Sequence, residues 1–181
     1  MAASTLQQFQ AQMRDGYVNG APGALVSGVV WLIAGAVAIG VSNTAAVYAL
    51  LIGGALIFPL SVVLTKLLGR RGTHDAGNPL GQLASEGTFW MLAGIAVAYA
   101  LATLKIEWFF PAMLLTIGGR YLTFQTIYGL RLYWLFGGIL CALGVALASL
   151  RASPHVGALA GGAVEMVFAV LLFRARPASA A

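Results

Sequence analysis

Runs of apolar residues, separated by short polar stretches, follow one another along almost the whole chain. A helix that crosses the ~30 Å hydrocarbon core of a bilayer needs ~20 such residues. The pattern therefore predicts six membrane-spanning helices, at Ala24–Val41, Thr44–Leu64, Gln82–Leu104, Trp108–Ile127, Tyr133–Leu150 and Val156–Phe173. Because the connections are short, we expect an all-α, polytopic membrane bundle whose sequential neighbours are antiparallel.

These spans define one transmembrane domain, residues 21–175, between an N-terminal segment, 1–20, and a C-terminal tail, 176–181. Four apolar residues of the N-terminal segment fall near one helical face, namely Leu6, Phe9, Met13 and Tyr17. Ser4 or Thr5 is available as the N-cap, and a glutamine follows each of them three residues later. The segment is therefore predicted to be an amphipathic helix at the membrane surface, with recruitment of a partner as the alternative.

The composition agrees with a lipid environment. The chain of 181 residues is 60% hydrophobic and only 8% charged, with a mean hydropathy of +0.90. An average soluble domain carries about 25% charged residues. The net charge of +5 does not indicate a nucleic-acid partner, because the basic residues lie mostly at the ends of apolar runs.

Basic residues at the ends of spans report orientation, since cytoplasmic loops carry an excess of Lys and Arg. With the N-terminus inside, the cytoplasmic segments hold Arg14, Lys66, Arg70, Arg71, Arg131, Arg174 and Arg176, and the outer loops hold Lys105 and Arg151. The asymmetry predicts that both termini are cytoplasmic, which in a bacterium means the inner membrane.

An internal repeat is suggested by two recurring patterns. The odd-numbered spans carry Trp-x-x-x-Gly at 31–35, 90–94 and 134–138. The even-numbered spans carry Gly-Gly at 53–54, 118–119 and 161–162, each followed by a phenylalanine, at Phe58, Phe124 and Phe168. The patterns predict three helical hairpins related by an axis along the membrane normal. The alternative is chance, because the chain contains 23 glycines.

Two charges fall deep inside the predicted spans. Arg120 lies eleven residues before Arg131, and Glu165 lies nine residues before Arg174. At 1.5 Å per residue these separations are ~16 Å and ~14 Å, so both charges are expected near the middle of the bilayer. Intramembrane charges are normally paired or face water. Arg120 and Glu165 are each other's best available partner, and we expect a hydrogen-bonded ion pair.

Polar residues accompany Arg120 along its span. Tyr121, Gln125 and Tyr128 form a stripe at helical spacing beside Arg120. Two interpretations stay open. In the first, Arg120 and Glu165 form a buried pair that fixes helix register. In the second, these five residues border a midplane site for a small polar substrate, an anion or a proton.

The stretch GGALIFPLSVVLTKLLG at 53–69, followed by GNPLGQLASE at 77–86, resembles a family of small uncharacterised bacterial six-span membrane proteins, a domain of unknown function. The likeness covers the chain from about Tyr17 to Leu150. It implies a bacterial membrane protein, and it supplies no catalytic or binding residues.

No nucleotide-binding or metalloprotease motif occurs, and no nucleophile is placed beside a base. We therefore expect no enzyme, no cofactor and no metal site. The sequence favours a small transporter or channel-like protein, whose substrate is unknown. The alternative is a non-transporting scaffold or accessory subunit, with Gly157-x-x-x-Gly161 as a face for self-association. A homo-oligomer is compatible with both hypotheses.

Overall fold

The computed structural model describes residues 5–175. Within this range the chain is helical and contains no strand. The α-helices are α1 (Leu6–Tyr17), α2 (Ala21–Gly40), α3 (Asn43–Leu67), α4 (Pro79–Leu104), α5 (Phe109–Tyr128), α6 (Leu132–Ser149) and α7 (Pro154–Arg174). Two short 3-10 turns, η1 (Val18–Gly20) and η2 (Ile106–Trp108), precede α2 and α5. The predicted tail, with Arg176, and the alternative N-cap Ser4 lie outside the described residues.

Each predicted span coincides closely with one helix, from α2 to α7. Five helical stretches of the described chain are long and apolar enough to cross a membrane, and they contain α2, α3, α4, α6 and α7. Helix α5 is as long as α2 but is not among them. Its arginine, threonines, tyrosines and glutamine lower its hydropathy. The protein is a helical membrane protein, and α5 is its most polar long helix.

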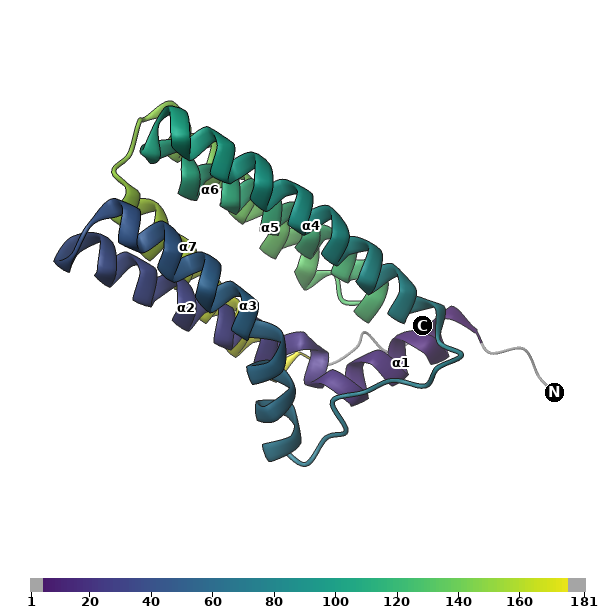
Figure 1. Cartoon of the computed structure of the whole chain (residues 1–181). Coiled ribbons are helices and arrows are strands. Elements are labelled where there is room, and N and C mark those ends of the chain that lie inside the picture. The colour runs from purple at the N-terminus through teal and green to yellow at the C-terminus, as the bar shows by residue number, and fades with distance from the viewer. Residues whose placement is uncertain (1–4, 176–181) are drawn as a thin grey trace.

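The long helices are arranged in two groups of three (Figure 1). In one group α2 packs along both α3 and α7, and in the other α5 packs along both α4 and α6. The groups meet more lightly, chiefly where α7 contacts α6 and α5. The helices therefore do not pack as three equivalent hairpins, because α7 contacts α2 far more closely than it contacts α6.

The three tryptophans of the Trp-x-x-x-Gly pattern have different surroundings. Trp31 is 1% exposed and lies against Phe110, whereas Trp90 and Trp134 are 79% and 57% exposed. On the outside of a membrane bundle, an exposed tryptophan faces lipid or the interface. The threefold repeat stays a prediction from the sequence, and its matching residues do not share one structural role.

Glycines set the closest approaches between helices. A Cβ added to Gly137 of α6 would lie 2.5 Å from the carbonyl oxygen of Gly118 on α5. The next residue, Gly138, has nothing within 4 Å of such a Cβ. Close backbone contact of this kind is how lipid-embedded helices pack without a hydrophobic driving force. One glycine of the pair is therefore required for packing and its neighbour is not.

Helix α1 lies across one end of the bundle (Figure 1). Thr5 is its N-cap and forms the predicted capping box with Gln8. Its polar face is not free, because Gln10 Nε2 donates to the Thr126 carbonyl at 2.8 Å and Arg14 donates to the Tyr128 carbonyl at 2.6 Å. These are carbonyls of the last turn of α5, which lack partners within their own helix. Helix α1 is therefore amphipathic, and its polar face is hydrogen-bonded to the end of α5.

The turn after α1 joins several helix ends. Val18, Asn19 and Gly20 have consecutive φ angles of 52°, 58° and 80°, a left-handed conformation that is costly for a β-branched residue. The Asn19 side chain donates to two carbonyls at the C-terminal end of α7, both at 3.0 Å. The Tyr133 hydroxyl of α6 donates to the Asn19 carbonyl at 2.7 Å. This corner therefore ties α6 and α7 to the start of α2.

The adjacent glycines of α6 give a matched test of helix packing. We expect Gly137→Ala to lower the free energy of unfolding by about 1–3 kcal/mol, because the added methyl group overpacks the contact with α5. Gly138→Ala is expected to leave stability unchanged or to raise it by up to about 1 kcal/mol, the helix-propensity gain. Thermal unfolding in detergent measures both. Equal effects of the two changes contradict the packing of α5 on α6.

Candidate functional site

Glu165, in the middle of α7, is fully buried, with an exposed fraction of 0%. The chain has five acidic side chains, and the other four, Asp15, Asp75, Glu86 and Glu107, are exposed. Glu165 is therefore the one acidic group enclosed by the fold. Enclosure makes it the first candidate for a functional group, because buried ionisable residues in membrane helices are costly.

Two hydroxyl groups face the Glu165 carboxyl. The Tyr121 hydroxyl of α5 donates to Oε1 at 3.4 Å, which is long for this type of bond. Ser27 of α2 is also buried, and its side chain is directed to the same carboxyl group. The second oxygen, Oε2, has no hydrogen-bond partner among the described residues. The site thus consists of one carboxyl group and two hydroxyls, contributed by α7, α5 and α2.

Close packing of α2 against α7 walls the site off. A Cβ added to Gly28 would lie 3.1 Å from the backbone nitrogen of Met166. A Cβ added to Gly162 would lie 3.0 Å from the backbone nitrogen of Leu32. These contacts flank Glu165 along the chain, so the glycines bring the two backbones together on both sides of the carboxyl group. Larger residues there would hold the helices apart.

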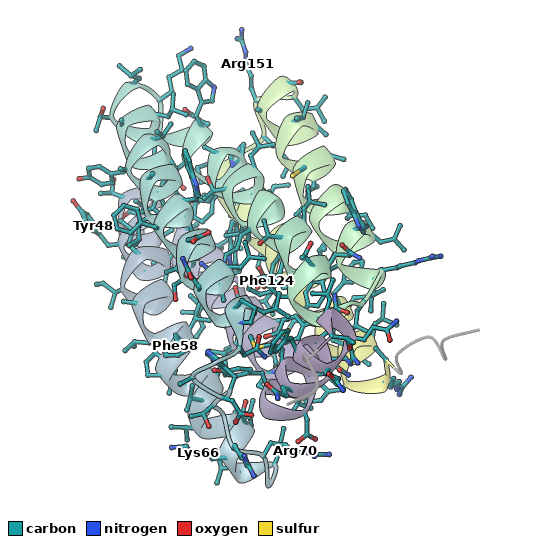
Figure 2. All side chains as sticks on the ribbon, turned by 90° about the vertical axis from the view of Figure 1, so that its right-hand side faces the viewer. Tyr48, Phe58, Lys66, Arg70, Phe124 and Arg151 are labelled. Carbon is teal, nitrogen blue, oxygen red and sulfur yellow. The ribbon has the colours of Figure 1, made fainter. Side chains whose placement is uncertain are left out.

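Stacked aromatic rings fill the interior beside the site. The ring of Tyr121 stacks on Phe136 with 3.9 Å between centroids, and Phe136 stacks on Phe168 at 4.4 Å. Tyr133 and Tyr128 continue the cluster, with 5.4 Å between their centroids. Phe124 is the next member, and Figure 2 shows it within the bundle. The cluster leads from Glu165 toward the end of the bundle that α1 covers.

Arg120 points away from Glu165. Its Nη1 is 3.6 Å from the Met91 sulfur on α4, and its guanidinium carbon is 5.3 Å from the centre of the Phe124 ring. Within residues 5–175 the one ion pair closer than 4.0 Å joins Arg70 and Asp15. The Arg120–Glu165 ion pair expected from the sequence is therefore not formed.

The geometry of the helix explains why Arg120 and Glu165 do not form this ion pair. Consecutive residues of an α-helix project about 100° apart. Tyr121 takes the direction toward α7, and its neighbour Arg120 consequently faces α4. Equal depth, which the sequence does predict, does not bring two side chains onto facing sides of their helices. Arg120 is left as a half-buried cation with a thioether and an aromatic ring for neighbours.

The other predicted site residues are distributed along α5. Tyr121 is part of the site, and Tyr128 lies further toward α1 in the aromatic cluster. Gln125 is half-buried, and its side chain makes no hydrogen bond within residues 5–175. Sequence reasoning missed Ser27. The available signal is that Ser27 is the one polar side chain of α2.

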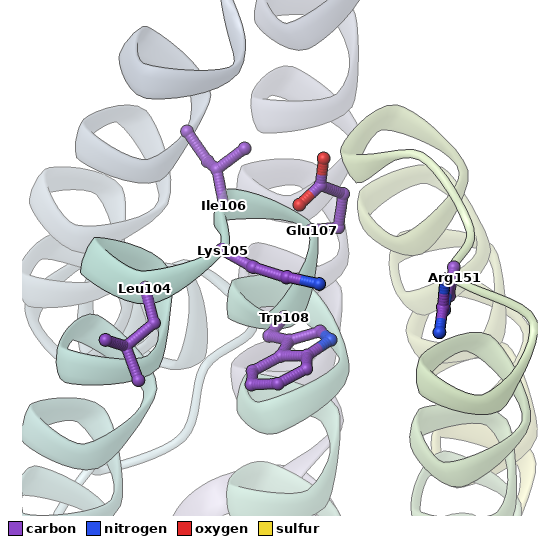
Figure 3. Close-up of a pocket in the computed structure, with 6 residues that line it drawn as sticks. All are labelled: Leu104, Lys105, Ile106, Glu107, Trp108 and Arg151. Carbon is purple, nitrogen blue, oxygen red and sulfur yellow. The ribbon is translucent and has the colours of Figure 1, made fainter.

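A separate pocket of about 480 Å³ lies between the loops at the opposite end from α1. It is lined by Leu104, Lys105, Ile106, Glu107, Trp108 and Arg151 (Figure 3). The Lys105 ammonium lies 5.6 Å from the Trp108 ring centre, a cation–π contact. The pocket includes no residue of the Glu165 site. In the described part of the chain no group of three or more His, Cys, Asp or Glu residues is placed to hold a metal ion.

The fold and the enclosed acidic site define a helical membrane protein with a polar group in its core. The chain belongs to a family of unknown function, DUF7010, whose sequence profile matches residues 6–175. This match confirms the resemblance to an uncharacterised family. The chain matches no curated protein and no solved structure at a significant level.

A double-mutant cycle tests which partner Glu165 has. For Arg120→Met and Glu165→Gln we expect the effects on the free energy of unfolding to add within about 0.5 kcal/mol, because the two groups are not in contact. For Tyr121→Phe and Glu165→Gln we expect a coupling of about 0.5–1.5 kcal/mol, the usual contribution of a hydrogen bond. Thermal unfolding in detergent supplies the values. A strong coupling between Arg120→Met and Glu165→Gln would show that the two charges do form the ion pair that the sequence suggests, and would contradict the geometry of the site.

Proposed function

We propose that this protein is a small six-span transporter or channel-like protein of the bacterial inner membrane, with its site at the midplane around Glu165. The observation that carries the proposal is the enclosed carboxyl group whose Oε2 has no hydrogen-bond partner among the described residues. The substrate is a small polar molecule, an anion or a proton. No catalytic role is proposed.

Energetics favour a functional role over a purely architectural one. A charge at the centre of a bilayer costs from ~3 to more than 10 kcal/mol, depending on the method, unless it is paired or hydrated. An architectural buried pair offsets this cost by joining opposite charges. Here Arg120 faces α4 and Glu165 faces Tyr121 of α5, and the two charges are not joined. Two polar groups left without strong partners are better explained by a ligand that contacts them in another state.

Six spans with both termini in the cytoplasm are part of this proposal. Helix α5 runs alongside α4 and α6 (Figure 1), which supports its role as a span despite its lower hydropathy. Its neighbours cover much of its surface, so its polar groups need not face lipid. Lys66 and Arg70 lie at one end of the bundle and Arg151 at the other (Figure 2). The end with the larger number of basic residues is assigned to the cytoplasm.

The scaffold alternative loses one supporting feature. The Gly157-x-x-x-Gly161 motif is directed into the chain, because a Cβ at Gly157 would lie 2.9 Å from Phe110 and one at Gly161 would lie 2.8 Å from Leu114 and from Trp31. The motif is therefore used for internal packing and is not free for self-association. A homo-oligomer would need another face.

Water access to Ser27 separates the two hypotheses. We would replace the single cysteine, Cys141, by alanine and introduce Ser27→Cys, or Ala34→Cys as the control. Both positions are buried on α2, two helical turns apart, and only Ser27 faces the carboxyl group. A water-soluble methanethiosulfonate reagent then measures thiol access in intact membranes, with Thr73→Cys in the exposed loop as the reference.

A transporter opens its site transiently. If the open state is populated to ~0.1–10%, Ser27→Cys reacts at ~0.1–10% of the rate of Thr73→Cys. Ala34→Cys is expected to stay unreacted on the same timescale. If neither Ser27→Cys nor Ala34→Cys is detectably labelled, water does not reach the site, and the scaffold hypothesis is favoured.

A further inference from the structure

We propose that Glu165 is a proton-binding site and that its proton exchanges by way of the Tyr121 hydroxyl. The inference rests on the proposed function for its biological meaning, since it makes the proton the coupling ion of transport.

The groups that face Glu165 fit a carboxylic acid better than a carboxylate. Helix α2 contributes the Ser27 hydroxyl, α5 contributes the Tyr121 hydroxyl, and α6 contributes the aromatic ring of Phe136 to the same region. The nearest cation along the chain of α5, Arg120, is turned toward α4. An ionised carboxylate without a cation or several donors is strongly disfavoured in an apolar interior. A bound proton removes that charge.

The enclosure also selects a proton over a larger ion. Hard metal cations take about six or more oxygen ligands. The site offers two carboxyl oxygens and two hydroxyls, and none of its carboxyl surface is exposed. The aromatic stack and the glycine contacts between α2 and α7 occupy the surrounding space. A proton requires no cavity of its own.

The Tyr121 hydroxyl is the donor that the structure places on the Glu165 carboxyl, at 3.4 Å from Oε1. The stacked rings of Phe136 and Tyr133 pack against the ring of Tyr121 and hold it in this position. A phenolic hydroxyl both donates and accepts, so Tyr121 can pass its own proton to Glu165 as it takes another.

The uptake step is a simple transfer. A hydronium ion that reaches Tyr121 when the site is open gives a proton to its hydroxyl, which leaves a water molecule. Tyr121 delivers its own proton to the Glu165 carboxylate and keeps the one that it received. The charge of the site changes from −1 to 0, and release reverses every transfer.

Infrared spectroscopy of the whole protein in lipid vesicles tests the proposal directly. A protonated carboxyl absorbs separately from a carboxylate, and four of the five acidic side chains are exposed. At about pH 7, where exposed carboxyls are ionised, we expect a carboxylic-acid band that Glu165→Gln abolishes. Transfer to heavy water is expected to shift this band, because the proton exchanges. If Glu165→Gln does not fold, isotopic labelling of the glutamate carboxyl carbon identifies the band in the unmodified chain.

Tyr121→Phe tests the route. It removes one hydroxyl and keeps the ring stack, so we expect the band to remain and its exchange in heavy water to slow by on the order of 100-fold. Tyr48→Phe is the matched control, since Tyr48 lies on the exposed side of α3 and its hydroxyl lies 3.4 Å from that of Tyr99. Its exchange rate is expected to equal that of the unmodified protein.

Three results overturn the proposal. The first is that the unmodified protein and Glu165→Gln have the same spectrum in the carboxylic-acid region. The second is that the band is present but does not shift in heavy water. The third is that the band of Tyr121→Phe exchanges as fast as that of Tyr48→Phe. Failure of the proposed function looks different. In that case the band exchanges as expected while Ser27→Cys stays as unreactive as Ala34→Cys.

Discussion

A carboxyl group enclosed by three helices with no cation beside it is the constraint around which this bundle is organised. Ionised and unpaired, it would cost from ~3 to more than 10 kcal/mol at the middle of a membrane. The fold nevertheless keeps Glu165 at 0% exposure. It does so by bringing α2 and α7 into backbone contact at Gly28 and Gly162 and by placing the Tyr121 hydroxyl against the carboxyl. A cost of this size is comparable to the whole stability of a typical folded domain.

The helices that enclose the carboxyl group are also those that α1 and its following turn hold together. Arg14 binds the last turn of α5, and Asn19 binds the last turn of α7. The left-handed conformation is costly for Val18, and it persists because these contacts fix the turn. The end of the bundle that α1 covers is therefore tied to the two helices that carry Glu165 and Tyr121.

Hydropathy was sufficient to predict where the helices lie. Six apolar runs correspond to α2 through α7, and of the two caps that side-chain chemistry allows, Ser4 and Thr5, it is Thr5 that caps α1. Counting residues also predicts that Arg120 and Glu165 lie at similar depth in the membrane. Which helix packs against which does not, because an apolar face in a membrane looks the same whether it meets lipid or protein. The pairing of α7 with α2 therefore had no signal in hydropathy.

The sequence also left open which neighbouring helix each side chain of α5 faces. A change of one residue turns a side chain by about 100°, which is enough to separate Arg120 from α7 and to give Tyr121 its place. Ser27 was overlooked because a single hydroxyl in an apolar run is common in membrane helices. Its meaning depends on the carboxyl group opposite, which lies more than a hundred residues away in the chain.

Disulfide cross-linking tests most directly whether α2 and α7 close around Glu165. A Cβ at Gly35 would lie 2.6 Å from the Leu159 side chain and 3.3 Å from its backbone nitrogen, so the two residues are neighbours across the contact of α2 and α7. In a chain with Cys141→Ala, Gly35→Cys and Leu159→Cys are predicted to cross-link readily in native membranes. The control pair joins Leu159→Cys to Gly54→Cys, a position with nothing within 4 Å of its added Cβ, and should not cross-link. Cross-linking of the control pair but not of Gly35 with Leu159 would contradict the packing of α2 on α7, and with it the enclosed site.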